Sequence, residues 1–109
     1  MKQIDLGDIT AARERIAAAT VRTPVIAALA LRDRLTGPLH IKLESLQRTG
    51  SFKDRGALNR LLALTPEQST RGVATASAGN HAQAVAYHGS RLRIPVQVVM
   101  PEPTPRAHG

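Results

Sequence analysis

Apolar residues recur every three or four positions in three stretches of the chain, and this spacing predicts three amphipathic helices. The first is capped by Asp5, with a second acidic residue three positions on. It should end before Pro24, because the residue preceding a proline disfavours helical backbone. The second has Ser51 as its N-cap and Asp54 at its third position. The third covers 82–88 and should end at the glycine that follows. The positions expected to face a core are Ile9, Ala12, Ile16, Ala19, Ala57, Leu58, Leu61, Leu62, Leu64, Val85 and Ala86.

Three other segments predict strands. Residues 39–43 alternate between apolar and polar side chains, as half-buried strands do, whereas 72–76 and 95–100 are mostly apolar and indicate buried strands. A short helical segment over 29–35 precedes the first strand. The order strand, helix, strand, helix, strand predicts an α/β fold, with a parallel sheet between covering helices in a three-layer αβα arrangement.

Composition narrows the class of protein. With 109 residues and 42% hydrophobic content, the chain forms at most one ordinary domain with a modest core. The lack of cysteine excludes disulfides and cysteine-based zinc sites, and fits a reducing cytoplasm. The N-terminus lacks the apolar core of a signal peptide. The longest apolar run, Val25 to Leu31, is much shorter than the ~20 residues a membrane span requires, so we expect no membrane partner.

The formal net charge of +7 raises the question of nucleic-acid binding. The arginines are scattered along the chain, and their densest cluster is only Arg91 with Arg93. Phe52 and Tyr87 supply the aromatic side chains, too few for a base-stacking platform. We therefore expect no nucleic-acid partner and assign the charge to solvated surface.

One turn places a lysine at the start of the second predicted helix. Lys53 follows Ser51 and Phe52, and the partial positive charge of the helix N-terminus favours a neutral amine over an ammonium. The chain has 3 lysines against 12 arginines, so a lysine here suggests amine chemistry that a guanidinium cannot perform. The alternative is a surface lysine extending into water beside Asp54.

A second turn, Ser77-Ala78-Gly79-Asn80, follows the predicted strand 72–76. Consecutive backbone N–H groups at a helix start bind a carboxylate or phosphate, although a common glycine turn with Asn80 as helix cap is the alternative. An amine and a set of backbone donors, each at a strand-to-helix turn, are what a pyridoxal-phosphate (PLP) site needs. His81 and His88 could share a helix face, but no cysteine or carboxylate lies near them in sequence, so we expect no metal site.

Two segments resemble a known enzyme family. Residues 42–57, which read KLESLQRTGSFKDRGA, are similar to the PLP attachment segment of the threonine dehydratase and serine dehydratase family. Residues 77–83 resemble the substrate-carboxylate loop of the same family. The resemblance covers nearly the whole chain. It implies PLP as cofactor and the tryptophan synthase β-like fold, known as fold type II.

The resemblance also implies roles for individual residues. Lys53 would bond the cofactor and later take the Cα proton of the substrate, while Phe52 would pack beside the cofactor. Asn80 would hydrogen-bond the pyridoxal 3′-oxygen. The loop that would hold the substrate carboxylate, partly through backbone N–H groups, consists of Ser77, Gly79, Asn80 and His81.

The implied reaction is a β-elimination. Threonine or serine would lose its β-hydroxyl, and the resulting enamine would hydrolyse to a 2-oxo acid and ammonia. Small hydroxyamino acids are therefore the expected partners, together with further copies of the same chain in the full-length enzyme.

The resemblance implies a truncated member of fold type II. Residues 1–66 would be the N-terminal part of the large domain, and 67–109 the first half of the small domain. The glycine-rich loop that cups the PLP phosphate in the family, and its later Ser or Thr opposite the pyridine nitrogen, are not among these 109 residues. The alternatives are an inactive fragment, or another fold type II enzyme such as a serine racemase. Against a racemase, Ala78 stands where racemases carry a catalytic serine.

Overall fold

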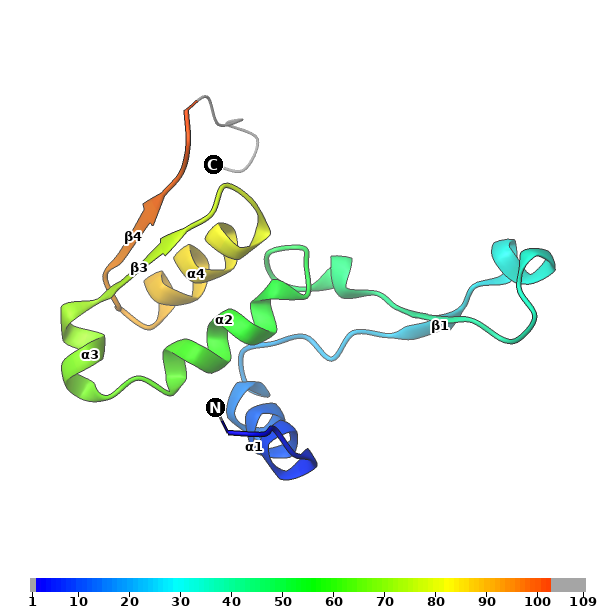
Figure 1. The fold of residues 1–109 in the computed structure, drawn as a ribbon, viewed down its shortest axis with the longest axis horizontal. Helices are drawn as coiled ribbons and strands as arrows, with labels where there is room; N and C mark the ends of the chain where they lie inside the picture. The colour runs from blue at the N-terminus through cyan, green and yellow to red at the C-terminus, as the bar shows by residue number, and fades with distance from the viewer. Residues whose placement is uncertain (1, 103–109) are drawn as a thin grey trace.

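The computed structural model describes residues 2–102. The strands of this part of the chain form two separate two-stranded sheets, one antiparallel and one parallel. Figure 1 shows the helices over 53–62 and 80–91 beside the parallel sheet, and a long arm that carries the antiparallel sheet. In chain order the elements are α1 (Leu6–Ile16), β1 (Val25–Ala27), the 3₁₀ helix η1 (Leu29–Arg34), β2 (His40–Lys42), the 3₁₀ helix η2 (Glu44–Leu46), α2 (Lys53–Leu62), α3 (Pro66–Arg71), β3 (Val73–Ala76), α4 (Asn80–Arg91) and β4 (Val96–Val99).

Helix α1 begins with the predicted capping box. Asp5 Oδ1 accepts from the N–H of Asp8 (2.9 Å), and Asp8 Oδ2 accepts from the N–H of Asp5 (3.0 Å). The helix packs against α2. Ile16 is buried at the end of α1, but Ile9 is 59% exposed, so the prediction that Ile9 lies in a core is wrong for the described chain.

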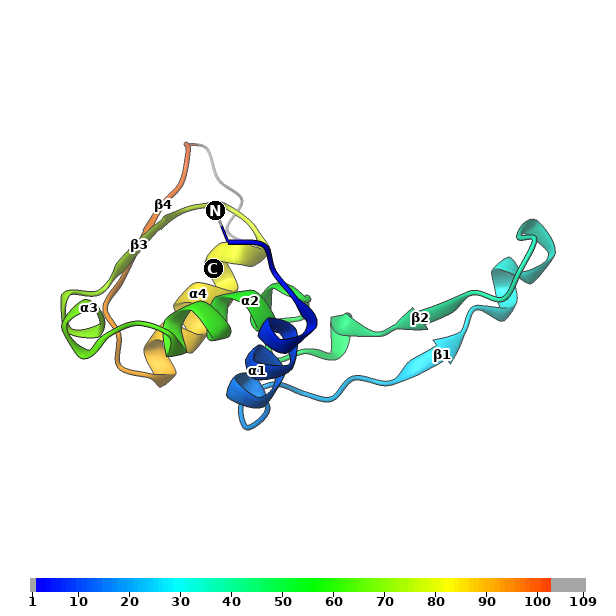
Figure 2. The same ribbon diagram turned by 60° about the horizontal axis from the view of Figure 1, so that its bottom comes forward.

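The strand predicted over 39–43 forms as β2, but it does not join the parallel sheet. It pairs with β1 in antiparallel register, with Val25 opposite Lys42 and Ala27 opposite His40. Pairing with a strand nearby in sequence closes a shorter loop than pairing with β3, and therefore costs less chain entropy. Both ribbon views show this pair as an arm that projects away from the helices (Figures 1 and 2).

The predicted strand–helix–strand unit is confirmed in the second half of the chain. β3 and β4 are parallel, with Val73 opposite Val96 and Ala76 opposite Val99, and α4 is the crossover between them. Gly72, with a φ of 88°, leads into β3, where a Cβ would lie only 2.5 Å from the carbonyl oxygen of Pro95. A glycine is therefore needed where these two segments approach each other.

The parallel sheet has one covered face. Alternate residues of β3 and β4 are half-buried and exposed, so the prediction of fully buried strands between two helical layers is wrong within residues 2–102. Figure 2 shows α4 and α2 on the same side of the sheet. Their small side chains allow close packing. The core consists of Ala57, Ala84 and Val85, with Val73 and Val96 packed against them.

Helix α4 is longer than predicted. Gly89 does not end it but lies inside it, where a Cβ would overlap the side chain of Val96. The chain leaves the helix through Arg93, whose φ of 58° lies in the left-handed region. Two expected core positions are also exposed, Ala86 in α4 and Leu62 in α2. No helix within residues 2–102 is both long and apolar enough to cross a bilayer.

Candidate functional site

The turn into α2 presents Lys53 as the first residue of the helix. Its N–H donates to Ser51 Oγ (3.2 Å), and Ser51 is buried. The N-cap position belongs to Phe52, so the prediction that Ser51 occupies it is wrong by one residue. The backbone at the base of the Lys53 side chain is nevertheless anchored by the Ser51 hydroxyl.

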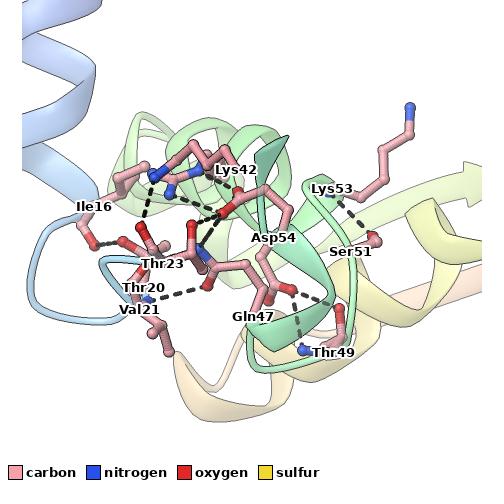
Figure 3. Close-up of polar contacts among 12 residues, drawn as sticks. Ile16, Thr20, Val21, Thr23, Lys42, Gln47, Thr49, Ser51, Lys53 and Asp54 are labelled. Carbon is pink, nitrogen blue, oxygen red and sulfur yellow. Dashed lines mark hydrogen bonds and ion pairs between the residues drawn. The ribbon is translucent and has the colours of Figure 1, made fainter. Parts of the chain in front are cut away.

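The Lys53 side chain contacts the Phe52 ring but has no polar partner in the described chain. Its Nζ lies 5.3 Å from the centroid of the Phe52 ring, and has no hydrogen-bond or ion-pair partner among residues 2–102. Figure 3 shows this side chain extending away from the other labelled residues. Phe52 is 61% exposed, so the amine and the ring together form an open surface. A free primary amine on an anchored backbone is suited to attacking a carbonyl carbon.

Asp54, the next residue, does not cap α2 as predicted. It is fully buried, and its Oδ2 accepts hydrogen bonds from the N–H (3.0 Å) and Oγ1 (2.7 Å) of Thr49. Its Oδ1 lies 2.5 Å from Nε2 of His88, which is also fully buried. This pair, missed in the sequence, joins the first turn of α2 to α4. The available signal was a histidine seated on the apolar face of α4, three residues after Val85.

A polar cluster precedes the lysine turn. Glu44 accepts hydrogen bonds from Thr23 Oγ1 (2.5 Å) and from Arg55 Nε (2.5 Å) and Nη2 (3.2 Å). The hydrogen bonds from Arg55 lower the pKa of Glu44 to about 2, and the ion pair raises the pKa of Arg55. Gln47 bonds both the N–H (3.0 Å) and the C=O (2.8 Å) of Val21, as Figure 3 shows for the N–H. These contacts tie the base of the arm to the segment that carries Lys53.

The Ser77–His81 loop opens α4. Its N-cap is Gly79, whose N–H donates to Ser77 Oγ (3.2 Å), and Asn80 is the first helical residue. Asn80 is therefore not the helix cap, although a common glycine turn, now capped by Gly79, stays the alternative to a binding loop. The N–H groups of Asn80 and His81 have no partner among residues 2–102, as expected for the first turn of a helix. Such donors can bind an anion.

The two turns lie on the same side of the α2–α4 pair in both ribbon views (Figures 1 and 2). An open groove of about 330 Å³ runs between these helices and the start of β3. Among the predicted site residues it includes His81, but not Lys53 or Asn80. The groove is lined by Gly56, Ala57, Arg60, Leu61, Leu64, Val73, Ala74, His81 and Val85.

Comparison with known families decides the class of protein. The model of the pyridoxal-phosphate dependent enzyme family matches residues 16–108, which is most of the chain. The chain belongs to this family. It is 47% identical over 105 residues to the L-threonine dehydratase catabolic TdcB of Staphylococcus aureus (strain USA300), an alignment that covers 95% of this chain and 30% of the relative.

Solved structures of family members match the fold. A serine racemase from maize superposes with a TM-score of 0.90 and 38% identity, over 98% of this chain and 32% of the racemase. The processed form of threonine deaminase isoform 2 from Solanum lycopersicum gives a TM-score of 0.76 and 39% identity, over 98% of this chain and 31% of the deaminase. The chain thus spans about 30% of the length of the curated relatives it matches.

The described residues fit the chemistry of PLP in part. The cofactor bonds a lysine amine, and Lys53 has an exposed Nζ without a polar partner in the described chain. The free N–H groups at the start of α4, with the exposed Asn80 side chain beside them, are donors for anionic or phenolic oxygens. Within residues 2–102, no group of three or more His, Cys, Asp or Glu side chains is placed to hold a metal ion.

Proposed function

We propose that this chain is the cofactor-attaching part of a PLP-dependent threonine or serine dehydratase. The observation that carries the proposal is the Lys53 amine, anchored at its backbone and without a polar partner in the described chain, in a protein that is 47% identical to a threonine dehydratase. The activity belongs to the whole enzyme, of which this chain corresponds to about 30%. Residues 1–66 would lie in its large domain and 67–109 in its small one; residues 103–109 lie outside the described part.

The site residues would share the tasks of holding the cofactor, holding the substrate and moving a proton. Lys53 would hold the cofactor and then move the Cα proton of the substrate through its Nζ, and Phe52 would pack beside the ring. Asn80 would bond the phenolic oxygen of the cofactor. The bound cofactor supplies an electron sink, so that loss of the Cα proton drives departure of the β-hydroxyl as water. The substrate carboxylate would be held by the loop of Ser77, Gly79, Asn80 and His81.

A chimera tests this function. We would replace the matching N-terminal part of the S. aureus threonine dehydratase with this chain, and measure 2-oxobutanoate and ammonia from threonine. We expect activity, and its loss in Lys53→Ala together with the visible absorbance band of a lysine-bound cofactor. Lys2→Ala is the matched control, because Lys2 is a surface lysine paired with Asp8. A folded, PLP-loaded chimera without 2-oxo acid formation would reject the proposal.

A serine racemase is the second candidate, favoured by the TM-score of 0.90 with the maize enzyme. The methyl side chain of Ala78 cannot move a proton at the second face of Cα, so we expect elimination without efficient racemisation. The chimera should therefore form little D-serine from L-serine, and Ala78→Ser should raise that yield. D-serine formation by the Ala78 chimera at a rate close to elimination would favour the racemase instead.

A further inference from the structure

Asp54 and His88 form a fully buried polar pair that the proposed chemistry does not use. Oδ1 of Asp54 and Nε2 of His88 are 2.5 Å apart, and both side chains have no exposed surface. The residues are 34 positions apart in the sequence and lie on different helices. The pair is therefore a direct polar link between the first turn of α2 and the body of α4.

The Asp54 carboxylate also reaches back to the turn before α2. Its Oδ2 accepts from the N–H and the Oγ1 of Thr49, and Figure 3 shows these contacts. Lys53 thus lies between two backbone anchors, the Ser51 hydroxyl bonded to its own N–H and the Asp54 carboxylate one residue on. Its side chain extends away from both (Figure 3).

The hydrogen-bonding pattern assigns the proton of the imidazole. Nδ1 of His88 is buried without a partner, so a hydrogen on that nitrogen would be desolvated and unpaired. The tautomer with its hydrogen on Nε2 donates to Asp54 and leaves only a lone pair unpartnered. The carboxylate oxygens of Asp54 accept three hydrogen bonds in all, two from Thr49 and one from His88.

Such a buried pair adds little to the free energy of unfolding by itself. Desolvation of a buried charge offsets most of its attraction, and apolar residues of similar volume often stabilise a fold as well or better. What directional hydrogen bonds add is a defined geometry. His88 lies eight residues after Asn80 in the same helix, about 12 Å along a rigid axis. Fixing His88 on Asp54 therefore also fixes the Ser77–His81 loop relative to Lys53.

We propose that Asp54 and His88 are positioning residues for Lys53. They hold the start of α2 at a set angle and distance from the loop that opens α4, so that one ligand can meet the amine and the loop donors together. The inference rests on the proposed function, in which Lys53 and this loop share a cofactor. It makes no claim that either residue contacts the cofactor.

The test compares two aldehydes on the three lysines of the chain. The 109-residue protein is treated with PLP and borohydride, and separately with formaldehyde and borohydride, and labelling at Lys2, Lys42 and Lys53 is measured by peptide mass spectrometry. Formaldehyde, which is too small to need a binding site, reports the accessibility and intrinsic reactivity of each amine. The ratio of PLP labelling to methylation therefore reports whether groups around an amine help to bind the larger aldehyde. We expect this ratio to be highest at Lys53.

The decisive variant replaces the pair by apolar residues, Asp54→Leu with His88→Leu. We expect it to remain folded, because apolar contact between the helices offsets loss of the polar pair, although Thr49 also loses its acceptor. The PLP-to-formaldehyde ratio at Lys53 should fall by about tenfold, because the reacting groups are then misplaced. His88→Gln retains an N–H donor for Asp54 and should keep most of the ratio. Leu61→Ala is the control, because it removes a buried side chain from α2 without touching either anchor of Lys53.

The outcomes separate the two proposals. An unchanged ratio at Lys53 in the folded double variant would overturn the positioning role and leave the proposed function standing. A fall of the same size in Leu61→Ala would also overturn it, because general loosening of the helices would then explain the effect. Equal ratios at all three lysines of the unmodified chain would overturn the attachment site, and the positioning role with it.

Discussion

Replacing Glu44 by glutamine should remove a measurable part of the acid sensitivity of this fold. The Glu44 carboxylate accepts two hydrogen bonds from Arg55 (2.5 and 3.2 Å) and one from Thr23 (2.5 Å). Its side chain is only 16% exposed. Glutamine keeps the shape but loses the charge, and its amide nitrogen places a donor against one of the donors that now face Glu44. The substitution therefore removes the ion pair that joins the base of the arm to α2.

The size of the effect follows from the pKa of Glu44. The pKa falls from 4.5 to about 2 in the folded protein, chiefly through the hydrogen bonds from Arg55. Because the folded state binds this proton less tightly than the unfolded chain, the contribution to stability is complete above pH ~4.5 and is lost as the pH falls toward ~2. The shift corresponds to about 3 kcal/mol. Since the Arg55 side chain is 33% exposed, water screens the pair, and we expect about 1–3 kcal/mol.

Urea unfolding followed by circular dichroism between pH 7 and pH ~2 measures this contribution. The unmodified chain should lose about 1–3 kcal/mol more than Glu44→Gln between pH ~5 and ~2, and the variant should be the less stable protein at pH 7. Glu14→Gln serves as the control, because Glu14 is an exposed glutamate of α1 without a described partner. If the free energy of unfolding falls by the same amount in Glu44→Gln and in the unmodified chain over this pH range, the Glu44–Arg55 ion pair does not stabilise the fold and the reasoning is wrong.

Three further predictions follow from particular residues. Arg93→Gly should raise the free energy of unfolding by about 0.5–1 kcal/mol, because the left-handed φ of 58° strains a side chain but not a glycine; an unchanged or lower melting temperature would contradict this. Leu58→Ala should lower the free energy of unfolding by about 2–5 kcal/mol, since Leu58 is fully buried, and a loss below about 1 kcal/mol in urea titrations would show that the site collapses or is solvated. The chain should self-associate as salt is raised to about 1 M, because salt screens the repulsion from the +7 charge. Apolar residues on the arm, such as Val25 and Ile41, stay exposed and can then bind another copy. A monomer at all salt concentrations in sedimentation velocity would contradict this prediction.

The pattern of apolar and polar residues predicted which segments form helices and strands better than it predicted which strands pair. The parallel pair β3–β4 with α4 between them follows from two apolar segments flanking a helical one, and it forms as expected. The alternation of 39–43 also predicted a strand, but an alternating pattern is the same whichever strand lies alongside. The pairing of β2 with β1 was therefore beyond the reach of periodicity.

The predictions for Gly89 and Asp54 were wrong for a related reason. Gly89 was expected to end a helix, but a glycine is equally required where a neighbouring segment comes close, and here Val96 does so. Asp54 has the spacing of a capping residue, but its carboxylate turns inward to His88. Short-range rules assign such residues to the nearest backbone, whereas their actual partners lie on other elements. Lys53 was singled out by its turn position together with the resemblance of residues 42–57 to a PLP attachment segment, and its role stays a proposal.

Polar contacts, more than apolar burial, hold the segment that carries Lys53. Before the lysine, the Glu44 ion pair with Arg55 and the Gln47 bonds to Val21 fix the chain; after it, Asp54 is bonded to His88. An apolar anchor needs a side chain that covers its neighbours, whereas under the proposed function the surface around Lys53 has to stay open for the cofactor. Directional hydrogen bonds to buried carboxylates can fix a backbone from behind while its outer face stays uncovered. This explains how Phe52 can remain 61% exposed and Lys53 unpaired within the described chain, beside some of its most buried polar groups.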